Sequence, residues 1–246
     1  MTSIDSSQRV AAKVAGFMLL FLMAAGFFAQ IYVPSEVVVA GDAATTADNV
    51  VTHEWLFRIG SATDVLIFAG DIVMAVAFYV LLKRVRPGLV MLGLLWRVAQ
   101  ATIMAVNALT FLAVPLIVHG TADLRGFTTE QRQALATVFV GLHTTGFGIG
   151  LVFLGLGNAL FSYVLFRSGY IPRALAGWGV FANVVLAAFT LTVLIAPGTE
   201  NAPVVAVGRY VPVFLFEVIT GGWLLISGVR MPANAESPAV AKVPQT

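Results

Sequence analysis

The stretch Phe57–Leu82, FRIGSATDVLIFAGDIVMAVAFYVLL, decides how the rest of the chain is interpreted. It is almost entirely apolar, and about 20 such residues in a helix cross a hydrocarbon core roughly 30 Å thick. Lipid offers the backbone no hydrogen-bond partner, so a membrane span here must be a helix. Asp64 and Asp71 lie inside the stretch, and an ionised carboxylate near the bilayer centre costs about 2.5–3.5 kcal/mol on insertion. Each aspartate therefore needs either a partner that offsets this cost or a functional role that requires a carboxylate there.

The composition of the whole chain agrees with a membrane protein. Only 11% of the 246 residues are charged, against about 25% in soluble domains, and the mean hydropathy is +0.93. The formal net charge of +2 is small, so no nucleic-acid partner is predicted. The chain has no cysteine, which excludes disulfides, thiolate metal sites and cysteine nucleophiles. No sequence pattern identifies a cofactor.

Six stretches are long and apolar enough to cross a membrane, namely 11–33, 57–82, 88–118, 133–166, 173–196 and 209–229. The predicted fold class is therefore all-α, a polytopic transmembrane helical bundle over residues 11–230. Residues 1–10 are predicted to be a cytoplasmic N-terminal segment, and the Pro- and Ala-rich residues 231–246 a disordered cytoplasmic tail. The first apolar run is interpreted as a retained span, because no small-x-small cleavage site follows it.

Two helix starts can be located from local patterns. In GDAATTADNVVTHEW, residues 41–55, Asp42 is a candidate N-cap. Apolar residues then recur at helical spacing, at Ala47, Val50, Val51 and Trp55. This pattern predicts a short interfacial helix in the first outer loop. Thr128 and Gln131 form a candidate capping box at the start of the fourth span.

Basic residues are distributed unequally between the two ends of the predicted spans. The end that includes the N-terminus has nine, namely Arg9, Lys13, Lys83, Arg84, Arg86, Arg167, Arg173, Arg230 and Lys242. The other end has four, namely Arg58, Arg125, Arg132 and Arg209. Because cytoplasmic loops carry the excess of lysine and arginine, we expect both termini to be cytoplasmic.

The third predicted span offers a partner for one aspartate. In WRVAQATIMAVNALT, residues 96–110, the side chains of Arg97, Gln100 and Asn107 share one side of the helix. Arg97 lies about 13 Å from the inner end at 1.5 Å per residue, and Asp71 lies near the same midplane. We therefore predict a buried pair of Asp71 and Arg97. Such a pair can also serve only to fix the register of two helices.

Other polar side chains lie closer to the outer end. Asp64, Glu217 and His143 are predicted at similar depths, with Tyr210 on the Glu217 face and Asn107 nearby. We expect them to line a polar, outward-facing cavity among the second, third, fourth and sixth spans. Asp64, His143 and Glu217 would also be the ligands of any metal ion. No close-spaced motif such as HExxH supports a metal, and a single helix histidine is more often a hydrogen-bonded packing residue.

These polar positions also carry a resemblance. The matching pieces are Arg58-x-Gly60-x-x-x-Asp64 with Asp71, Arg97-x-x-Gln100, His143-x-x-Gly146 followed by IGLVFLG, and YVLFRSGYIPRAL after the fourth span. Together they resemble an uncharacterised family of bacterial membrane proteins, the domain-of-unknown-function family 4386, over most of residues 10–230. The resemblance implies a compact multi-span protein of the bacterial inner membrane and no particular activity.

Three functions remain open on this basis. The first is binding of a small ligand or cation, coupled to protons or not, by Asp64, Asp71, His143 and Glu217. The second is an intramembrane metal-dependent hydrolase in which a bound ion activates water. The third is a non-catalytic accessory subunit of a membrane assembly, or a homo-oligomer, in which the charged pair and glycines serve packing alone.

Overall fold

The computed structural model describes residues 5–39, 41–121 and 124–230, and in this part of the chain the fold is helical without strands. The first span is one continuous rod, Ser6–Val37. It consists of α1 (Ser6–Gly26), the π-helical segment η1 (Phe27–Tyr32) and α2 (Val33–Val37). The remaining elements are α3 (Ala43–Thr52), α4 (Glu54–Leu82), α5 (Pro87–His119), α6 (Thr129–Ser168), α7 (Arg173–Ile195), η3 (Pro197–Thr199) and α8 (Pro203–Ile226).

Six of the described helices are long and apolar enough to cross a membrane, which confirms the predicted all-α bundle. The first of them begins at Ser6, inside the segment predicted to precede the membrane domain. The fourth begins at Thr129 and ends at Ser168, so it is longer than its apolar core. The tail predicted for 231–246 lies outside the described residues.

The helix starts follow the predicted capping patterns. The Asp42 carboxylate accepts a hydrogen bond of 2.9 Å from the Thr45 backbone N–H, and this bond holds the pKa of Asp42 below its usual range. Thr128 and Gln131 make both hydrogen bonds of the capping box at the start of α6. Helix α3 is therefore present where the sequence predicted it.

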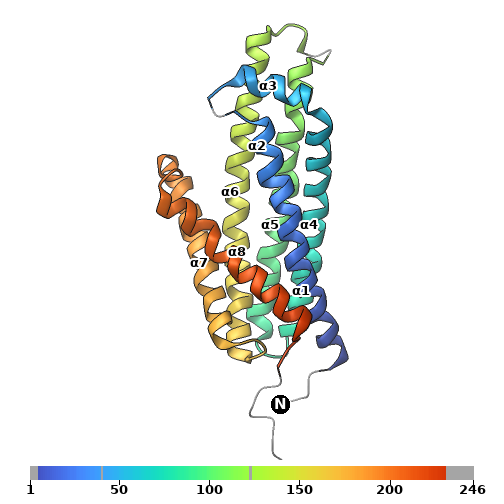
Figure 1. Ribbon diagram of the computed structural model, residues 1–246, viewed down its shortest axis with the longest axis vertical. Coiled ribbons are helices and arrows are strands. Elements are labelled where there is room, and N and C mark those ends of the chain that lie inside the picture. Colours follow the sequence, from blue (N-terminus) through green and yellow to red (C-terminus); the bar gives the residue numbers. More distant parts are fainter. Residues whose placement is uncertain (1–4, 40, 122–123, 231–246) are drawn as a thin grey trace, which may run out of the picture.

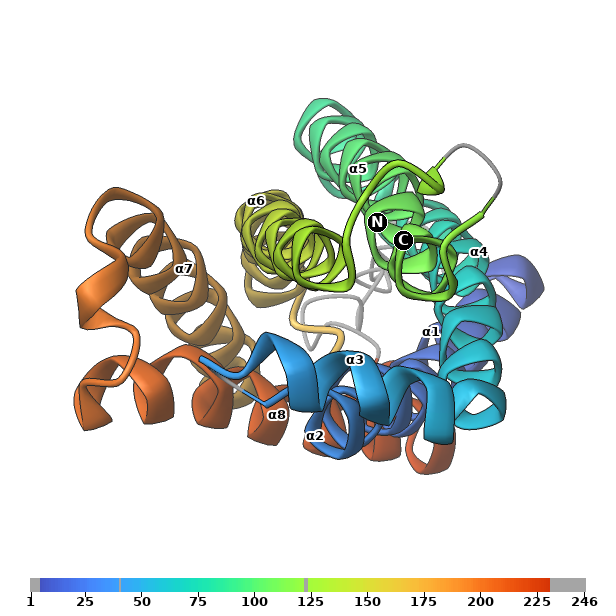
Figure 2. The same cartoon turned by 90° about the horizontal axis from the view of Figure 1, so that it is seen from above.

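The six long helices follow one another in chain order around the bundle, and α8 returns to α1 (Figures 1 and 2). Helix α4 packs between α1 and α5, and α6 packs between α5 and α7. Helix α8 runs obliquely from α7 to the lower part of α1, so that it closes the bundle only at that end (Figure 1). The α5–α6 and α6–α7 interfaces are the most extensive of the bundle, whereas α8 meets α1 only toward one end.

Glycines allow close helix crossings in the bundle. A Cβ on Gly16 would lie 2.8 Å from the carbonyl oxygen of Gly221, so α1 and α8 touch backbone to backbone there. A Cβ on Gly157 would lie 3.1 Å from the carbonyl oxygen of Gly93, so α6 also approaches the backbone of α5. Small residues at such crossings are the usual way in which membrane helices gain packing energy.

The buried apolar side chains form two clusters. The larger one joins α1, α4, α5 and α6 and includes Leu81, Phe78 and Phe161. The smaller one lies beneath α3, where Val50 and Phe57 meet Phe111. Helix α3 thus covers the end of the bundle instead of lying apart from it, with Val51 and Trp55 left exposed.

Candidate functional site

A cavity of about 510 Å³ lies within the membrane-spanning part of the bundle, and all six long helices contribute to it. Most of its walls are apolar, including Leu22, Met104, Leu151, Leu154 and Leu186. The polar lining residues are Gln30, Asp71, Arg97, Gln100, Tyr210 and Glu217. The cavity therefore combines an apolar interior with a small set of charged and amide groups.

Asp71 and Arg97 form the ionic centre of this cavity. An Nη2 hydrogen of Arg97 is donated to Asp71 Oδ1, and Gln100 Nε2 donates to Asp71 Oδ2 at 3.0 Å. Both carboxylate oxygens are thus engaged, and the Arg97 and Asp71 side chains are only 1% and 7% exposed. The structure brings together Asp71 and Arg97, which the sequence places at one depth, and adds Gln100 from the same side of α5.

Arg97 fits at this position because α6 has a glycine opposite it. A Cβ on Gly157 would lie 2.9 Å from Arg97 Cγ and 3.0 Å from Cδ. The aliphatic stem of Arg97 therefore packs directly against the α6 backbone. Among the described residues, its Nε and Nη1 atoms have no hydrogen-bond partner and are out of contact with solvent.

Glu217 on α8 is the second carboxylate of the cavity, and its surroundings differ from those of Asp71. Asn158 of α6 donates to Glu217 Oε1 at 3.4 Å. Within the part of the chain that the structure describes, no Lys, Arg or His lies within ion-pair distance of Glu217. Its side chain is half-buried. Glu217 therefore faces the cavity without a basic partner.

The cavity opens on the side of the bundle. Four lining residues are exposed, namely Phe27 and Ile31 of η1 and Tyr210 and Phe214 of α8. The other lining residues are buried or half-buried. Since α1 and α8 touch at Gly16 and Gly221 and diverge from there (Figure 1), the mouth lies between η1 and the first half of α8.

The comparison with family models decides which family this fold represents. The model "Domain of unknown function (DUF4386)" matches residues 14–228. The chain belongs to this family. The match includes every residue that lines the cavity. Searches of curated proteins and of solved structures found no match.

In this DUF4386 protein, Asp64 lies outside the cavity in which the sequence analysis placed it. It is 5% exposed, and Gln30 Nε2 of η1 donates to its Oδ1 at 3.1 Å. The expected neighbours were His143 and Glu217, but η1 of the first span passes over this part of α4 and provides Gln30 instead. Gln30 also lines the cavity, so Asp64 lies behind the cavity wall.

His143 and Asn107 form a separate pair between α5 and α6. Asn107 Nδ2 lies 2.9 Å from the His143 carbonyl oxygen, to which it donates, and 3.2 Å from His143 Nδ1. The imidazole stacks on Phe111 with ring centroids 4.6 Å apart. His143 is therefore a hydrogen-bonded packing residue beneath α3, and neither residue lines the cavity.

These positions also correct the metal hypothesis. The described residues contain no group of three or more His, Asp or Glu side chains that could hold a metal ion. Asp64, His143 and Glu217 face Gln30, Asn107 and Asn158 respectively. The sequence placed them at one depth, but depth along a helix does not fix the direction in which a side chain points.

The expected opening toward the outer water is also absent from the described part of the chain. Residues of the smaller apolar cluster fill the bundle beneath α3, where Val37, Val50 and Phe57 are each no more than 1% exposed. The expected cavity omitted the first span, whereas η1 forms one side of the actual mouth. Tyr210, expected beside Glu217, does line the cavity and lies at that mouth.

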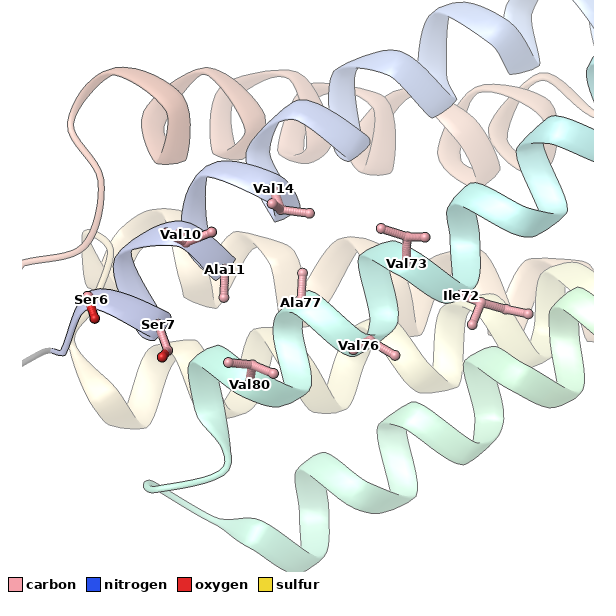
Figure 3. A pocket seen from close by; sticks show the side chains of 10 residues that line it. All are labelled: Ser6, Ser7, Val10, Ala11, Val14, Ile72, Val73, Val76, Ala77 and Val80. Atoms are coloured by element: carbon pink, nitrogen blue, oxygen red, sulfur yellow. The ribbon is translucent and has the colours of Figure 1, made fainter.

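A second hollow, of about 590 Å³, lies between α1 and α4 (Figure 3). Its lining residues are Ser6, Ser7, Val10, Ala11, Val14, Ile72, Val73, Val76, Ala77 and Val80. Figure 3 shows small aliphatic side chains along both helices and the two serines at one end. No charged side chain lines it in the described structure, and its walls are mostly aliphatic.

Two residues of the site were missed by the sequence analysis. Gln30 and Asn158 are single amides in long apolar stretches. A polar residue in such a stretch is itself a signal, because lipid solvates amides poorly. That signal identifies the residue, but it does not identify Asp64 or Glu217 as the partner.

Proposed function

We propose that this integral membrane protein binds a small amphiphilic ligand in the cavity between α1 and α8. The observation that carries the proposal is the joint presence of apolar walls and two carboxylates in one cavity of about 510 Å³. Small-molecule sites typically have volumes of about 300–1,000 Å³, apolar linings and a few convergent polar groups.

The Asp71–Arg97 pair alone does not require a ligand. A buried ion pair can serve only to fix helix register, and it is weak evidence of function. Glu217 is different because it is not part of that pair and has no basic partner within the described residues. Ionisable groups inside a membrane that lack a structural partner usually mark pathways for ligands or protons.

The position of the mouth supports an amphiphilic ligand over a purely polar one. Phe27, Ile31 and Phe214 are 61%, 58% and 50% exposed on helices that span the membrane. Acyl chains would contact such side chains directly, and a molecule dissolved in the bilayer would meet this opening first. Coupling to a proton is part of the proposal, with Glu217 as the group that exchanges it.

Photoaffinity labelling tests the proposal. The purified protein in zwitterionic nanodiscs would be exposed to dodecyl probes that carry a diazirine on the chain and a trimethylammonium, hydroxyl or carboxylate head group. We expect at least one probe to label cavity residues such as Leu151 or Met104, with the adducts located by peptide mass spectrometry.

A matched pair of variants separates the cavity from the lipid-facing surface. Val213→Trp fills the cavity from α8, whereas Val211→Trp adds the same side chain at an exposed position outside it. Cavity labelling should fall in the first variant and persist in the second. Labelling confined to the outer surface of the bundle in the unaltered protein would contradict ligand binding and favour an accessory subunit.

A further inference from the structure

We propose that the cavity selects lipophilic monocations, which reach it from the bilayer between η1 and α8 and use Glu217 as their counter-charge. This inference rests on the proposed function and adds the charge of the ligand, its route and the residue that recognises it. Three independent features of the cavity carry it.

The first feature is the charge balance of the cavity lining. Arg97 and Gln100 engage both oxygens of Asp71, so that group is neutral as a unit. Glu217 then adds one carboxylate whose donor in the described structure is the uncharged Asn158 amide. The lining therefore has one more acidic than basic side chain, and a single positive charge complements it.

The second feature is which polar atoms a ligand can reach. The free Nε and Nη1 hydrogens of Arg97 would suit an anion, but both atoms are out of contact with solvent. Arg97 itself is 1% exposed and packs against Gly157. Glu217 is only half-buried and lines the cavity. Arg97 also lines the cavity, but its guanidinium is closed off from solvent, so the carboxylate of Glu217 is the charged group that a ligand reaches more readily.

The third feature is the route. The mouth has three exposed aromatic rings, those of Phe27, Tyr210 and Phe214. The Arg209 guanidinium already lies over the Tyr210 ring, 5.1 Å from its centroid, so the rings left for a ligand cation are those of Phe27 and Phe214. Aromatic faces attract cations and also contact acyl chains favourably. The opening lies within segments that span the membrane, so a cation with an apolar body can enter sideways from the lipid. The apolar walls formed by Leu22, Leu151 and Leu154 then surround that body.

These features distinguish a lipophilic monocation from other classes of ligand. A neutral lipid offers the Glu217 carboxylate no counter-charge, so Glu217 would have to take up a proton to accommodate it, and an anion would be repelled by the carboxylate. A hydrated metal cation needs several oxygen ligands, whereas no group of three or more acidic or histidine side chains gathers in the described residues. An alkylammonium carries one delocalised or shielded charge and needs only one carboxylate with aromatic neighbours.

Competition binding with the three dodecyl probes tests the inference. Dodecyltrimethylammonium, dodecanol and dodecanoate would each be added before irradiation to compete with the diazirine probe that labels the cavity, in zwitterionic nanodiscs. The loss of labelling gives the affinity of each compound, and empty nanodiscs measure its partitioning into the lipid. We expect the ammonium compound to bind at least about tenfold more tightly than dodecanol, and dodecanoate to bind most weakly.

Variants of Glu217 identify the residue responsible. Glu217→Gln should abolish the preference for ammonium while dodecanol still binds, which also shows that the variant is folded. Glu217→Asp should keep the preference, because it keeps the charge. Glu36→Gln removes an acidic residue of α2 that does not line the cavity and should change nothing.

The outcomes separate the two proposals. If none of the three compounds displaces the label, or no label reaches the cavity, the proposed function itself is wrong. If dodecanol or dodecanoate binds as tightly as the ammonium compound, or Glu217→Gln retains the preference, the cavity binds ligands but the inference of a cation site is overturned.

Discussion

Asp71 of α4 and Arg97 of α5 form an ion pair that is almost completely shielded from solvent. Removing one partner of a buried pair leaves an uncompensated charge and costs about 3–5 kcal/mol. We therefore expect Asp71→Asn and Arg97→Leu each to lower the unfolding temperature of the detergent-solubilised protein markedly. The double variant should recover part of the combined loss, because it leaves no isolated charge.

Gln100→Leu is the comparison variant for this double-mutant cycle of Asp71 and Arg97. It removes the neutral donor to Asp71 and keeps the ion pair. Its effect should be about 1–3 kcal/mol, the cost of leaving a buried acceptor unsatisfied. Thermal unfolding followed by circular dichroism measures all four variants. Strictly additive losses for Asp71 and Arg97 would show that the two side chains are not in contact.

The close crossing of α5 and α6 predicts a glycine that does not tolerate a methyl group. In Gly157→Ala, the new Cβ would lie 2.9 Å from Arg97 Cγ and 3.1 Å from the Gly93 carbonyl oxygen. Since backbone cannot move aside as a flexible side chain can, we expect a loss of about 1–3 kcal/mol. Gly141→Ala on the same helix meets nothing within 4 Å and is the matched control.

Alanine is the better helix former, so the control should be neutral or stabilising by up to about 1 kcal/mol. The midpoint of thermal unfolding in detergent compares the two variants directly. Equal effects at both positions would mean that α5 and α6 are not in backbone contact at Gly93 and Gly157.

Local features of the fold were predictable because they depend on residues close in sequence. The six spans follow from apolar length, and the start of α3 follows from Asp42 and the spacing of Ala47 and Val50. The capping box of Thr128 is equally local. In lipid the helix is the one structure that satisfies an isolated apolar stretch, so length and composition decide the fold class.

The candidate site was only partly predictable, because it depends on how whole helices rotate and cross. Counting residues gives depth, and Asp71 and Arg97 lie at a shared depth on neighbouring antiparallel helices. The same count placed Asp64 near Glu217, but η1 of the first span packs on α4 and Gln30 takes that place. The π-helical segment at Phe27–Tyr32 changes which face of the first span packs against α4. No periodicity in the sequence predicts this segment.

The topology of the chain in the membrane remains a prediction from its basic residues. Because the sequence has no cysteine, single-cysteine variants report one position each. Ser227→Cys follows α8 and Thr121→Cys lies between α5 and α6 at the opposite end, both at exposed positions. In intact cells, a membrane-impermeant maleimide should label only the second variant. Labelling of Ser227→Cys from outside would place the termini outside.

The hydrogen bond between Gln30 and Asp64 ties the π-helical turn of the first span to α4. Asp64 is 5% exposed, so Gln30→Leu should leave a buried carboxyl without its donor and cost about 1–3 kcal/mol. Asp64→Leu should cost a similar amount through the unsatisfied Gln30 amide. Combining the two replaces both partners with apolar groups. The double variant should therefore lose less stability than the sum of the two single losses.

Thr63→Ala is the matched control, because this neighbouring hydroxyl is exposed and bonds only to Ile59 of its own helix. Thermal unfolding gives the coupling energy, and hydrogen exchange over residues 27–37 shows where the loss occurs. We expect faster exchange in η1 and α2 for Gln30→Leu and no change for Thr63→Ala. Unchanged exchange in Gln30→Leu, together with additive losses, would mean that Asp64 does not hold the turn in place.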